Sequence, residues 1–560
     1  MSHNNSRVAK IGNLSLGESF PVRIQSMTST NTMDTKATVE QSIRMIDAGC
    51  EMVRITAQGV REAEHLAVIK KELKKRGYDV PLIADIHFNP KAAQVAAGIV
   101  EKVRINPGNY IDKNRGKVNF TDEEYEVEIE KIKERIKPLI LICKNHNTAI
   151  RIGSNYGSLS ERILARFGNT PEGMVESAME FVRICKELDF HNLVLSMKAS
   201  NVKIMVKANR LLVKKMEEEE MNYPIHLGVT EAGDAEDGRI KSAAGIAVLL
   251  SDGIGDTIRV SLTDEPELEI PVAKTIVAFF GSRDSGFLDN KLTQRYSRRI
   301  SNKAGKVGGL QVPSVIVTGK NIYKQEFNEQ FLPDYILGNE NYLTKPEDGG
   351  QGPEFVMFDL ENEIILTEAG ENKIAVLDTD ISIPVKKVKQ VVMNLIESGL
   401  TNPIILKRNY QNLQSDSLMI KAAGEFAYLL IDGLLDGIWI ESGNQDSGSL
   451  AELSFGILQA TGDRISKTEY IACPSCGRTL FNIQDTLQRI KAKTSHLKGL
   501  KIGVMGCIVN GPGEMADADY GYVGAGKGKV TLYKRQQVIR KNIDEKDAVE
   551  ELVRIIHDDK

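Results

Sequence analysis

Residues 52–88 read MVRITAQGVREAEHLAVIKKELKKRGYDVPLIADIHF, and this stretch contains the repeating unit of the first half of the chain. Two short β-rich runs, Met52–Thr56 and Leu82–Phe88, flank a longer amphipathic stretch, Arg61–Arg76. Strands that alternate with helices in this way favour a parallel sheet with helices packed against it.

The same unit occurs eight times within residues 1–280. The other β-rich runs, each a predicted strand, are Val22–Met27, Lys102–Asn106, Thr148–Ile152, Asn192–Lys198, Ile225–Thr230 and Thr257–Leu262. Eight strand–helix units in this length predict a (β/α)8 TIM barrel. The alternative is an open doubly wound sheet, but no glycine-rich dinucleotide-binding motif follows the first strand.

Polar side chains recur near the carboxyl ends of the predicted barrel strands, although buried strands of a parallel sheet are normally apolar. Several come in pairs two residues apart, so both members face the same side of the sheet. TIM-barrel enzymes carry their active sites at this end of the barrel. We therefore predict one site that includes Arg54, Thr56, Asp85, His87, Arg104, Asn106, Arg151, Asn155, Lys198, Asn201, His226, Glu231, Arg259 and Ser261.

Positive charge exceeds negative charge in this predicted site. Its five cations are Arg54, Arg104, Arg151, Lys198 and Arg259, and its two carboxylates, Asp85 and Glu231, cannot neutralise them all. Arginine forks suit phosphate oxygens, so the excess predicts an anionic ligand such as a diphosphate. The alternatives are that each arginine forms a structural ion pair with a helix carboxylate, and that His87 is a hydrogen-bonded core histidine.

Residues 281–460 contain fewer strand–helix units. The predicted strands are Val312–Val317, Phe355–Leu360, Ile374–Leu377, Pro403–Lys407 and Gly437–Glu441. One internal repeat is visible, because Lys241–Val260 aligns without gaps to Lys421–Ile440. The repeat predicts an inserted, degenerate barrel-like α/β domain, although convergent α/β periodicity would give the same pattern. Trp439 stands where the first copy has Arg259, so we expect this domain to be a structural spacer.

Three of the six cysteines lie in the last part of the chain, residues 461–560, where we predict a small α+β domain. Cys473 and Cys476 form a Cys-x-x-Cys motif after the predicted strand Glu469–Ala472, and Cys507 follows the predicted strand Lys501–Met505. Thiolates are soft ligands that favour zinc or iron–sulfur clusters. The other cysteines, Cys50, Cys143 and Cys185, stand among apolar residues and are interpreted as small buried hydrophobes.

Two kinds of metal site fit these cysteines. Zinc could take His496 as a fourth ligand, although its spacing is not typical of zinc sites. An iron–sulfur cluster usually takes four cysteines, so three would leave one iron for a weaker ligand. Glu514, seven residues after Cys507, suits that position, and an oxygen ligand that can leave would make the iron a reaction site. The structural alternative is that Glu514 caps the following turn.

The composition excludes several classes of partner. The formal net charge is −4, which gives no general attraction to nucleic acid or anionic membranes. No apolar run approaches the ~20 residues that span a bilayer. The first ten residues are polar and contain no apolar signal core. We therefore expect a cytoplasmic protein with no nucleic-acid or membrane partner.

Six short stretches of this chain resemble the GcpE family of 4-hydroxy-3-methylbut-2-enyl diphosphate synthases. They are VRIQSMT (22–28), VRIT (53–56), ADIHF (84–88), VRINPGN (103–109), CPSCGR (473–478) and GCIVNGPGE (506–514). The resemblance covers residues 1–280 and 465–560. The middle segment resembles that of the longer family form, which carries an inserted barrel-like domain.

The resemblance implies an oxidoreductase of the non-mevalonate isoprenoid pathway. Its substrate would be 2-C-methyl-D-erythritol 2,4-cyclodiphosphate, held by the barrel, and its cofactor a [4Fe–4S] cluster. The implied ligands are Cys473, Cys476, Cys507 and Glu514. The implied electron donor is ferredoxin or flavodoxin, Glu231 is a candidate proton donor, and a homodimer is compatible with the sequence.

Overall fold

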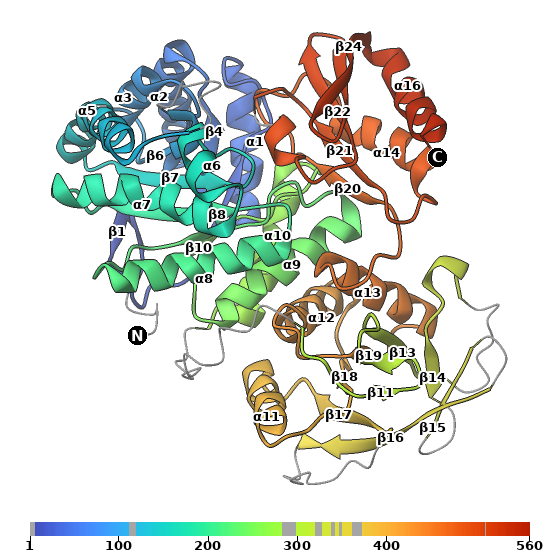
Figure 1. The fold of residues 1–560 in the computed structure, drawn as a ribbon. Coiled ribbons are helices and arrows are strands. Elements are labelled where there is room, and N and C mark those ends of the chain that lie inside the picture. Colours follow the sequence, from blue (N-terminus) through green and yellow to red (C-terminus); the bar gives the residue numbers. More distant parts are fainter. Residues whose placement is uncertain are drawn as a thin grey trace. The chain divides into compact units, whose positions relative to one another are not determined.

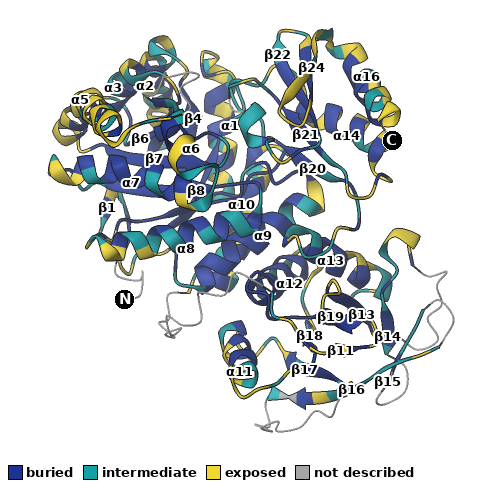
Figure 2. Ribbon diagram, in the orientation of Figure 1, coloured by how far each residue is buried: buried dark blue, intermediate teal, exposed yellow. Residues whose placement is uncertain are grey.

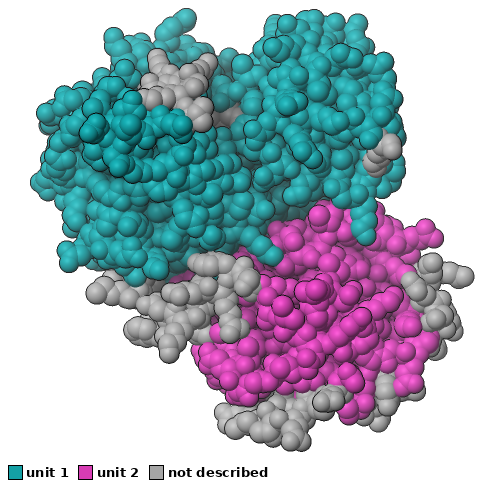
Figure 3. All heavy atoms as spheres, in the orientation of Figure 1, with its two compact units in different colours: residues 1–242, 253–285, 468–560 teal, residues 243–252, 286–467 magenta. Residues whose placement is uncertain are grey.

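The fold is described from a computed structural model of the chain. It describes residues 6–110, 119–282, 298–319, 327–337, 342–346, 350–360, 372–509 and 511–559. The chain forms two compact units, one of residues 1–242, 253–285 and 468–560, the other of residues 243–252 and 286–467 (Figure 3). The division groups the first and last predicted domains together, and the predicted boundaries at residues 280 and 460 stay predictions.

The first unit contains the predicted TIM barrel (Figure 1). Its strands pair in parallel in the order β8-β7-β6-β5-β4-β3-β10-β9, and a bridge between Leu195 and Ile225 joins β8 to the residue before β9. The strands are β3 (Arg23–Met27), β4 (Met52–Thr56), β5 (Leu82–Asp85), β6 (Lys102–Ile105), β7 (Ala149–Asn155), β8 (Leu193–Lys198), β9 (His226–Leu227) and β10 (Thr257–Ile258). All eight predicted strands are confirmed, and the last two are shorter than predicted.

Helices cover the outside of this barrel because each buries one apolar stripe. In α2 the stripe is Ala63, Leu66, Ile69 and Leu73, while the outer face is exposed (Figure 2). The helices are α1 (Thr35–Ala48), α2 (Val60–Lys75), α3 (Pro90–Ala97), α4 (Pro107–Tyr110), α5 (Asp122–His146), α6 (Glu161–Phe167), α7 (Pro171–Glu187), α8 (Val202–Glu218), α9 (Ala235–Ser251) and α10 (Glu269–Phe280). None of the helices described for this chain has the length and apolar character needed to span a membrane.

A hairpin of β1 (Ala9–Ile11) and β2 (Leu14–Leu16) packs at the amino-terminal end of the barrel. Its Ala9, Ile11 and Leu16 form one apolar cluster with residues from the first halves of four strands, Met52, Ile83, Ala149 and Val194. The carboxyl ends of the strands, where the polar residues were predicted to gather, therefore lie at the end of the barrel opposite this hairpin.

The second unit contains a closed barrel of seven strands. β13 pairs with β19 to close it, and β15 runs antiparallel to both its neighbours. The strands are β13 (Ser314–Val317), β14 (Tyr335–Leu337), β15 (Tyr342–Thr344), β16 (Gln351–Asp359), β17 (Ile374–Asp380), β18 (Ile404–Asn409) and β19 (Gly437–Glu441), and the helices are α11 (Val385–Glu397), α12 (Ser415–Leu430) and α13 (Ser447–Ala460). The predicted barrel-like domain is confirmed, but β14 and β15 were not predicted.

The internal repeat is also a repeat in structure. Asp256 in the first copy accepts hydrogen bonds from Ser6 Oγ at 2.9 Å and the Ile225 amide at 2.7 Å. Asp436, the aligned residue, accepts from Ser301 Oγ at 3.0 Å and the Ile404 amide at 3.0 Å. In both barrels this aspartate holds the start of the last strand against its neighbour, which supports a common ancestry for the two barrels.

The C-terminal domain is a five-stranded sheet with two helices on it, the predicted α+β arrangement (Figure 1). Its order is β20-β21-β22-β23-β24, parallel for the first three strands and antiparallel after them. The elements are β20 (Glu469–Ala472), α14 (Ile483–Thr494), β21 (Lys501–Met505), α15 (Gly511–Glu514), β22 (Tyr520–Gly526), β23 (Lys529–Lys534), β24 (Gln537–Asp544) and α16 (Glu545–Asp558). Leu487 of α14 and Leu552 of α16 pack with Val504 and Leu532 of the sheet.

Candidate active site

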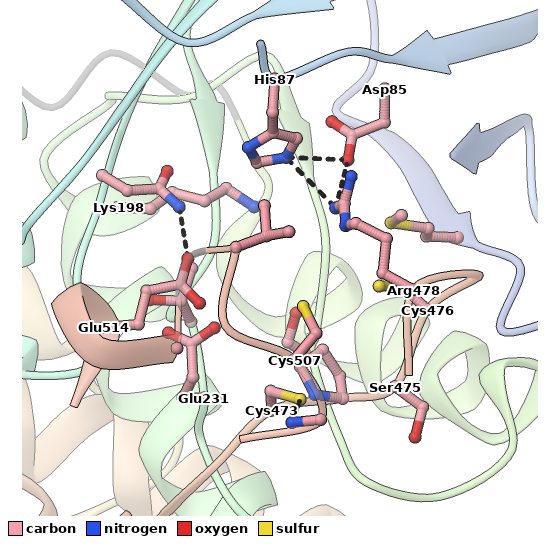
Figure 4. Close-up of a pocket in the computed structure, with 18 of the residues that line it drawn as sticks. Asp85, His87, Lys198, Glu231, Cys473, Ser475, Cys476, Arg478, Cys507 and Glu514 are labelled. Carbon is pink, nitrogen blue, oxygen red and sulfur yellow. Dashed lines mark hydrogen bonds and ion pairs between the residues drawn. The ribbon is translucent and has the colours of Figure 1, made fainter. Parts of the chain in front are cut away.

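One cavity in the first unit is lined by both the TIM barrel and the C-terminal domain (Figure 4). The barrel contributes the carboxyl ends of its strands, and the C-terminal domain contributes the turns after β20 and β21. The lining residues predicted from the sequence are Arg54, Asp85, His87, Arg104, Arg151, Asn155, Lys198, Glu231, Arg259, Ser261, Cys473, Cys476, Cys507 and Glu514.

Two backbone contacts hold these two parts together. Ala232, next to Glu231, forms a parallel β-bridge with Ala472, next to Cys473. Gly157 and Gly513 meet so closely that a Cβ atom on Gly157 would lie 2.0 Å from the Gly513 carbonyl oxygen. A larger residue at either position would push the C-terminal domain away from the barrel.

Three of the five predicted cations have no carboxylate partner among the residues that the structure describes. Arg54 directs Nε and Nη2 at the Met27 sulfur, at 3.0 and 2.8 Å, and a thioether is a weak acceptor. Arg151 donates to Ser196 Oγ at 3.1 Å, and Lys198 is buried. Burial lowers the pKa of Arg54 to about 10, an effect that the Asp85 carboxylate only partly offsets. Burial, then nearby cations, lowers the pKa of Lys198 well below its usual value. A bound anion would remove this penalty.

The other two cations are paired. Arg104 Nη1 lies 3.4 Å from Asp85 Oδ1 and 2.6 Å from His87 Nε2. Burial, then Arg478 and Arg104, lowers the pKa of His87 to about 3, so His87 is a neutral hydrogen-bond acceptor. Burial alone would raise the pKa of Asp85, but neighbouring charges, Arg54 foremost, hold it well below its usual range.

Arg259 fits the structural alternative rather than a free anion-binding role. Its Nη2 and Nε lie 3.3 and 3.4 Å from the two carboxylate oxygens of Glu269, at the start of α10. Helix α10 returns to the barrel, so its first residue meets the end of β10. Arg259 still lines the cavity, but its charge is already balanced.

Four predicted site residues do not line the cavity: Thr56, Asn106, Asn201 and His226. Asn106 accepts a hydrogen bond from the Gly108 amide at 3.3 Å in the turn that starts α4. Asn201 caps α8 and accepts from the Ile204 amide at 3.1 Å. Both follow strand ends, which is also where helix caps occur. Their assignment to substrate binding stays a prediction without support from this cavity.

Glu231 and Glu514 come from the two different domains and lie side by side (Figure 4). Burial, then the neighbouring Glu514, raises the pKa of Glu231 well above its usual value, which favours the protonated carboxylic acid. Glu514 accepts a hydrogen bond from Asn155 Nδ2 at 2.9 Å. Glu231 has a φ of 48°, a left-handed conformation that is uncommon outside glycine.

Cys473, Cys476 and Cys507 all line the cavity, together with Glu514. The Gly506 amide lies 3.3 Å from Cys473 Sγ and donates to it, as amides do to cluster sulfurs. Within the described residues no three His, Cys, Asp or Glu side chains converge on a point where one metal ion would bind. A [4Fe–4S] cluster instead takes each ligand on a different iron, so this donor set fits one. Asn510, in the same motif, lies outside the described residues.

The alternative zinc site is not supported. His496 is exposed and does not line the cavity. The remaining cysteines behave as predicted, since Cys50, Cys143 and Cys185 are all buried. Burial raises the pKa of Cys50 and of Cys143 to about 12, which makes them unreactive thiols.

Sequence reasoning missed Arg478 and Met27. Arg478 lines the cavity and reaches Asp85 and His87 from the other domain (Figure 4). Its position directly after the Cys-x-x-Cys-Gly motif was the available signal, because a charged residue there adjoins the metal ligands. Met27 ends β3, where its apolar side chain looked like ordinary core.

Comparison with known proteins agrees with this arrangement. A family model described as the GcpE TIM-barrel domain matches residues 6–274, and one described as the GcpE protein C-terminal domain matches residues 469–558. The chain is 49% identical to a relative from Parabacteroides distasonis over 98% of this chain and 97% of the relative. The chain belongs to the GcpE family.

Other GcpE relatives match over equally long stretches. One from Phocaeicola vulgatus is 49% identical, covering 99% of this chain and 98% of its own length. One from Akkermansia muciniphila is 44% identical, and the match covers 98% of this chain and 96% of the relative. All three relatives are named 4-hydroxy-3-methylbut-2-en-1-yl diphosphate synthase (flavodoxin). Because they align along the whole chain, the inserted barrel is common to this long form of the family.

Proposed function

We propose that this chain is a 4-hydroxy-3-methylbut-2-en-1-yl diphosphate synthase that reductively opens 2-C-methyl-D-erythritol 2,4-cyclodiphosphate. The observation that carries the proposal is the shared cavity, in which unpaired cations of the barrel face three cysteines and a glutamate of the C-terminal domain. Whole-length similarity to relatives with this name supports it. The reaction consumes two electrons and two protons. The bond between the tertiary carbon and its phosphate oxygen breaks, that oxygen stays on the diphosphate, and the neighbouring secondary hydroxyl leaves as water.

The barrel cations would bind the diphosphate. Arg54, Arg151 and Lys198 have no carboxylate partner in the described part of the chain, so phosphate oxygens can take their donors without breaking an ion pair. Arg104 would add a donor, for which the diphosphate would compete with Asp85. Each such charge-assisted hydrogen bond contributes about 1.5–3 kcal/mol.

Glu231 would deliver a proton. It is buried, its raised pKa favours the protonated acid, and it lines the same cavity as the barrel cations and the cysteine-bearing turns. Departure of an oxygen as water requires a proton at that oxygen, which a neutral carboxylic acid supplies. The Ala232–Ala472 bridge holds Glu231 at this place.

Cys473, Cys476, Cys507 and Glu514 would hold a [4Fe–4S] cluster. When bound, the cluster would supply the two electrons from a flavodoxin, the donor named for the relatives. Glu514 would be the one oxygen ligand of this set, and Asn155, which donates to its carboxylate, would orient it.

The test is anaerobic turnover by the iron-loaded protein. Reduced flavodoxin and the cyclodiphosphate should give 4-hydroxy-3-methylbut-2-enyl diphosphate, identified by mass spectrometry. The Lys198→Met variant should retain the cluster absorption and lose most turnover at low substrate, while the exposed-site variant Arg489→Gln should match wild type. Absence of product from fully iron-loaded wild type with a chemical reductant would refute the proposal.

A further inference from the structure

Arg478 belongs to the C-terminal domain, but its side chain ends inside the barrel mouth. Its Nη2 lies 3.3 Å from Asp85 Oδ2 and 3.2 Å from His87 Nε2 (Figure 4). The Arg478 side chain is 9% exposed and that of Asp85 2%. The ion pair therefore joins the two domains where water screens it little.

The turn that carries Arg478 lies against a barrel loop. A Cβ atom on Gly477 would be 2.9 Å from the Thr30 carbonyl oxygen, so glycine permits this approach. Thr32 Oγ1 in the same loop donates to the Thr56 carbonyl at 2.6 Å, which fixes the loop to the end of β4. The barrel loop, Gly477 and Arg478 together hold the Cys473–Arg478 turn against the barrel.

Asp85 is shared between cations of both domains. Arg104 contacts one carboxylate oxygen at 3.4 Å and Arg478 contacts the other at 3.3 Å. A diphosphate that engages Arg104 competes with Asp85 for that guanidinium. Arg478 then remains as the partner of Asp85, so substrate binding strengthens the link between Asp85 and the C-terminal domain rather than breaking it.

We infer that Arg478 is a positioning residue whose ion pair with Asp85 fixes the cysteine-bearing turn over the barrel mouth and so sets the distance between the bound diphosphate and the metal ligands. The inference rests on the proposed function. Lys241–Glu469 and Lys491–Asp234 also join the domains, but none of these four residues lines the cavity. Arg478 combines domain contact with direct access to the site.

The kinetic test compares Arg478→Gln, Arg478→Lys, Asp85→Asn and the double variant Arg478→Gln/Asp85→Asn with wild type. Arg489→Gln, an exposed change in the same domain, is the control. Arg478→Gln should keep its iron content and cluster absorption and change KM by less than about threefold, while kcat falls roughly 10- to 100-fold. Arg478→Lys should recover part of kcat. Loss of iron from both Arg478→Gln and Arg478→Lys would overturn the inference, because Arg478 would then serve cluster binding.

The double variant separates positioning from direct substrate contact. If Arg478 acts through Asp85, Arg478→Gln/Asp85→Asn should lose about as much kcat as the more damaging single change. Multiplicative losses of the two single variants would overturn the inference, since Arg478 would then act on the substrate independently of Asp85.

Hydrogen exchange tests positioning without turnover. In the iron-loaded protein without substrate, peptides that contain residues 229–234 and 469–475 should exchange roughly tenfold faster in Arg478→Gln than in wild type. Arg489→Gln should leave them unchanged. Equal exchange in Arg478→Gln and wild type would overturn the inference. A wild-type protein that fails to turn over the cyclodiphosphate would refute the proposed function but leave this measurement valid.

Discussion

At the level of single residues, the charge of Lys198 links substrate binding to pH. Burial, then Arg151, Arg54 and Arg259, holds its pKa well below the value of an exposed lysine. A bound diphosphate would stabilise the ammonium and raise that pKa. Between the two pKa values binding takes up a proton, so affinity should fall as pH rises.

Calorimetry can measure this proton uptake. Titrations with the cyclodiphosphate at about pH 8, in two buffers of different ionisation enthalpy, should give different apparent enthalpies. Lys198→Met should bind roughly 10- to 100-fold more weakly and take up less proton. Identical apparent enthalpies for wild type in both buffers would show that Lys198 does not change its charge.

Arg151 and Arg259 should respond differently to removal of their side chains. Arg151 has no carboxylate partner among the described residues, so Arg151→Ala should weaken substrate binding with little loss of stability. Arg259→Ala leaves Glu269, whose side chain is 2% exposed, without its counter-charge. That loss should lower the free energy of unfolding by about 3–5 kcal/mol. Denaturant unfolding of both variants checks this, and equal stability would contradict the pairing.

Substitution of a cysteine ligand and of the glutamate ligand should have different effects on the iron content. Cys507→Ser should lose most bound iron and all activity, because a hydroxyl is a poor ligand for a soft iron–sulfur site. Glu514→Ala should retain more iron and still lose turnover. Iron and sulfide assays with visible spectra measure the difference, with Ser475→Ala as the neighbouring control. Full iron content in Cys507→Ser would rule out the ligand assignment.

At the level of elements, the barrel strands could be predicted because each is a buried apolar run between amphipathic helices. Strands β14 and β15 could not be predicted, because each has only three residues and neither is followed by a helix that would reveal a strand–helix unit. β24 was missed for a different reason. Its residues Gln537–Asp544 are mostly exposed and three of the eight are charged, so no regular apolar alternation is visible.

Site prediction succeeded for side chains at strand ends and failed where tertiary contacts decide the role. Arg54 and Arg151 reach the cavity as the alternation of the strands requires. The partners of Arg259 and Arg478 lie on other elements, so neither ion pair has a local signal. Asn201 was assigned to the site because cap and site residues occupy the same place after a strand.

The repeated aspartate gives a prediction at this scale. Asp436 is buried and accepts from Ser301, Arg298 and the Ile404 amide, so Asp436→Ala leaves several buried donors without a partner. The free energy of unfolding of the second barrel should fall by about 2–5 kcal/mol. Hydrogen exchange in β18 and β19 should accelerate, with Glu397→Ala, an exposed change, as control. Unchanged exchange in these strands would contradict the role of Asp436.

At the level of the whole molecule, the two barrels differ in how their strand-end cations are balanced. In the second barrel Lys407 lies between Asp378 and Glu441, at 3.0 and 3.2 Å, and Arg408 pairs with Glu425 at 2.6 Å. These cations have no charge left for a phosphate, unlike Arg54, Arg151 and Lys198 of the first barrel. The prediction that the inserted domain is a spacer therefore gains support from its electrostatics.

A spacer of this size would let one chain supply both halves of its own active site. The barrel and the C-terminal domain of one chain form one compact unit. They are joined by the Ala232–Ala472 β-bridge and by an ion pair in which Lys241 Nζ lies 2.7 Å from Glu469 Oε1. We therefore expect no complementation between Cys507→Ser and Arg151→Ala chains, each inactive alone. Under closure between chains, a mixed dimer would join one intact barrel to one intact cluster domain and regain activity. Clear activity in such mixtures, with chain exchange verified by mass spectrometry, would exclude closure within one chain.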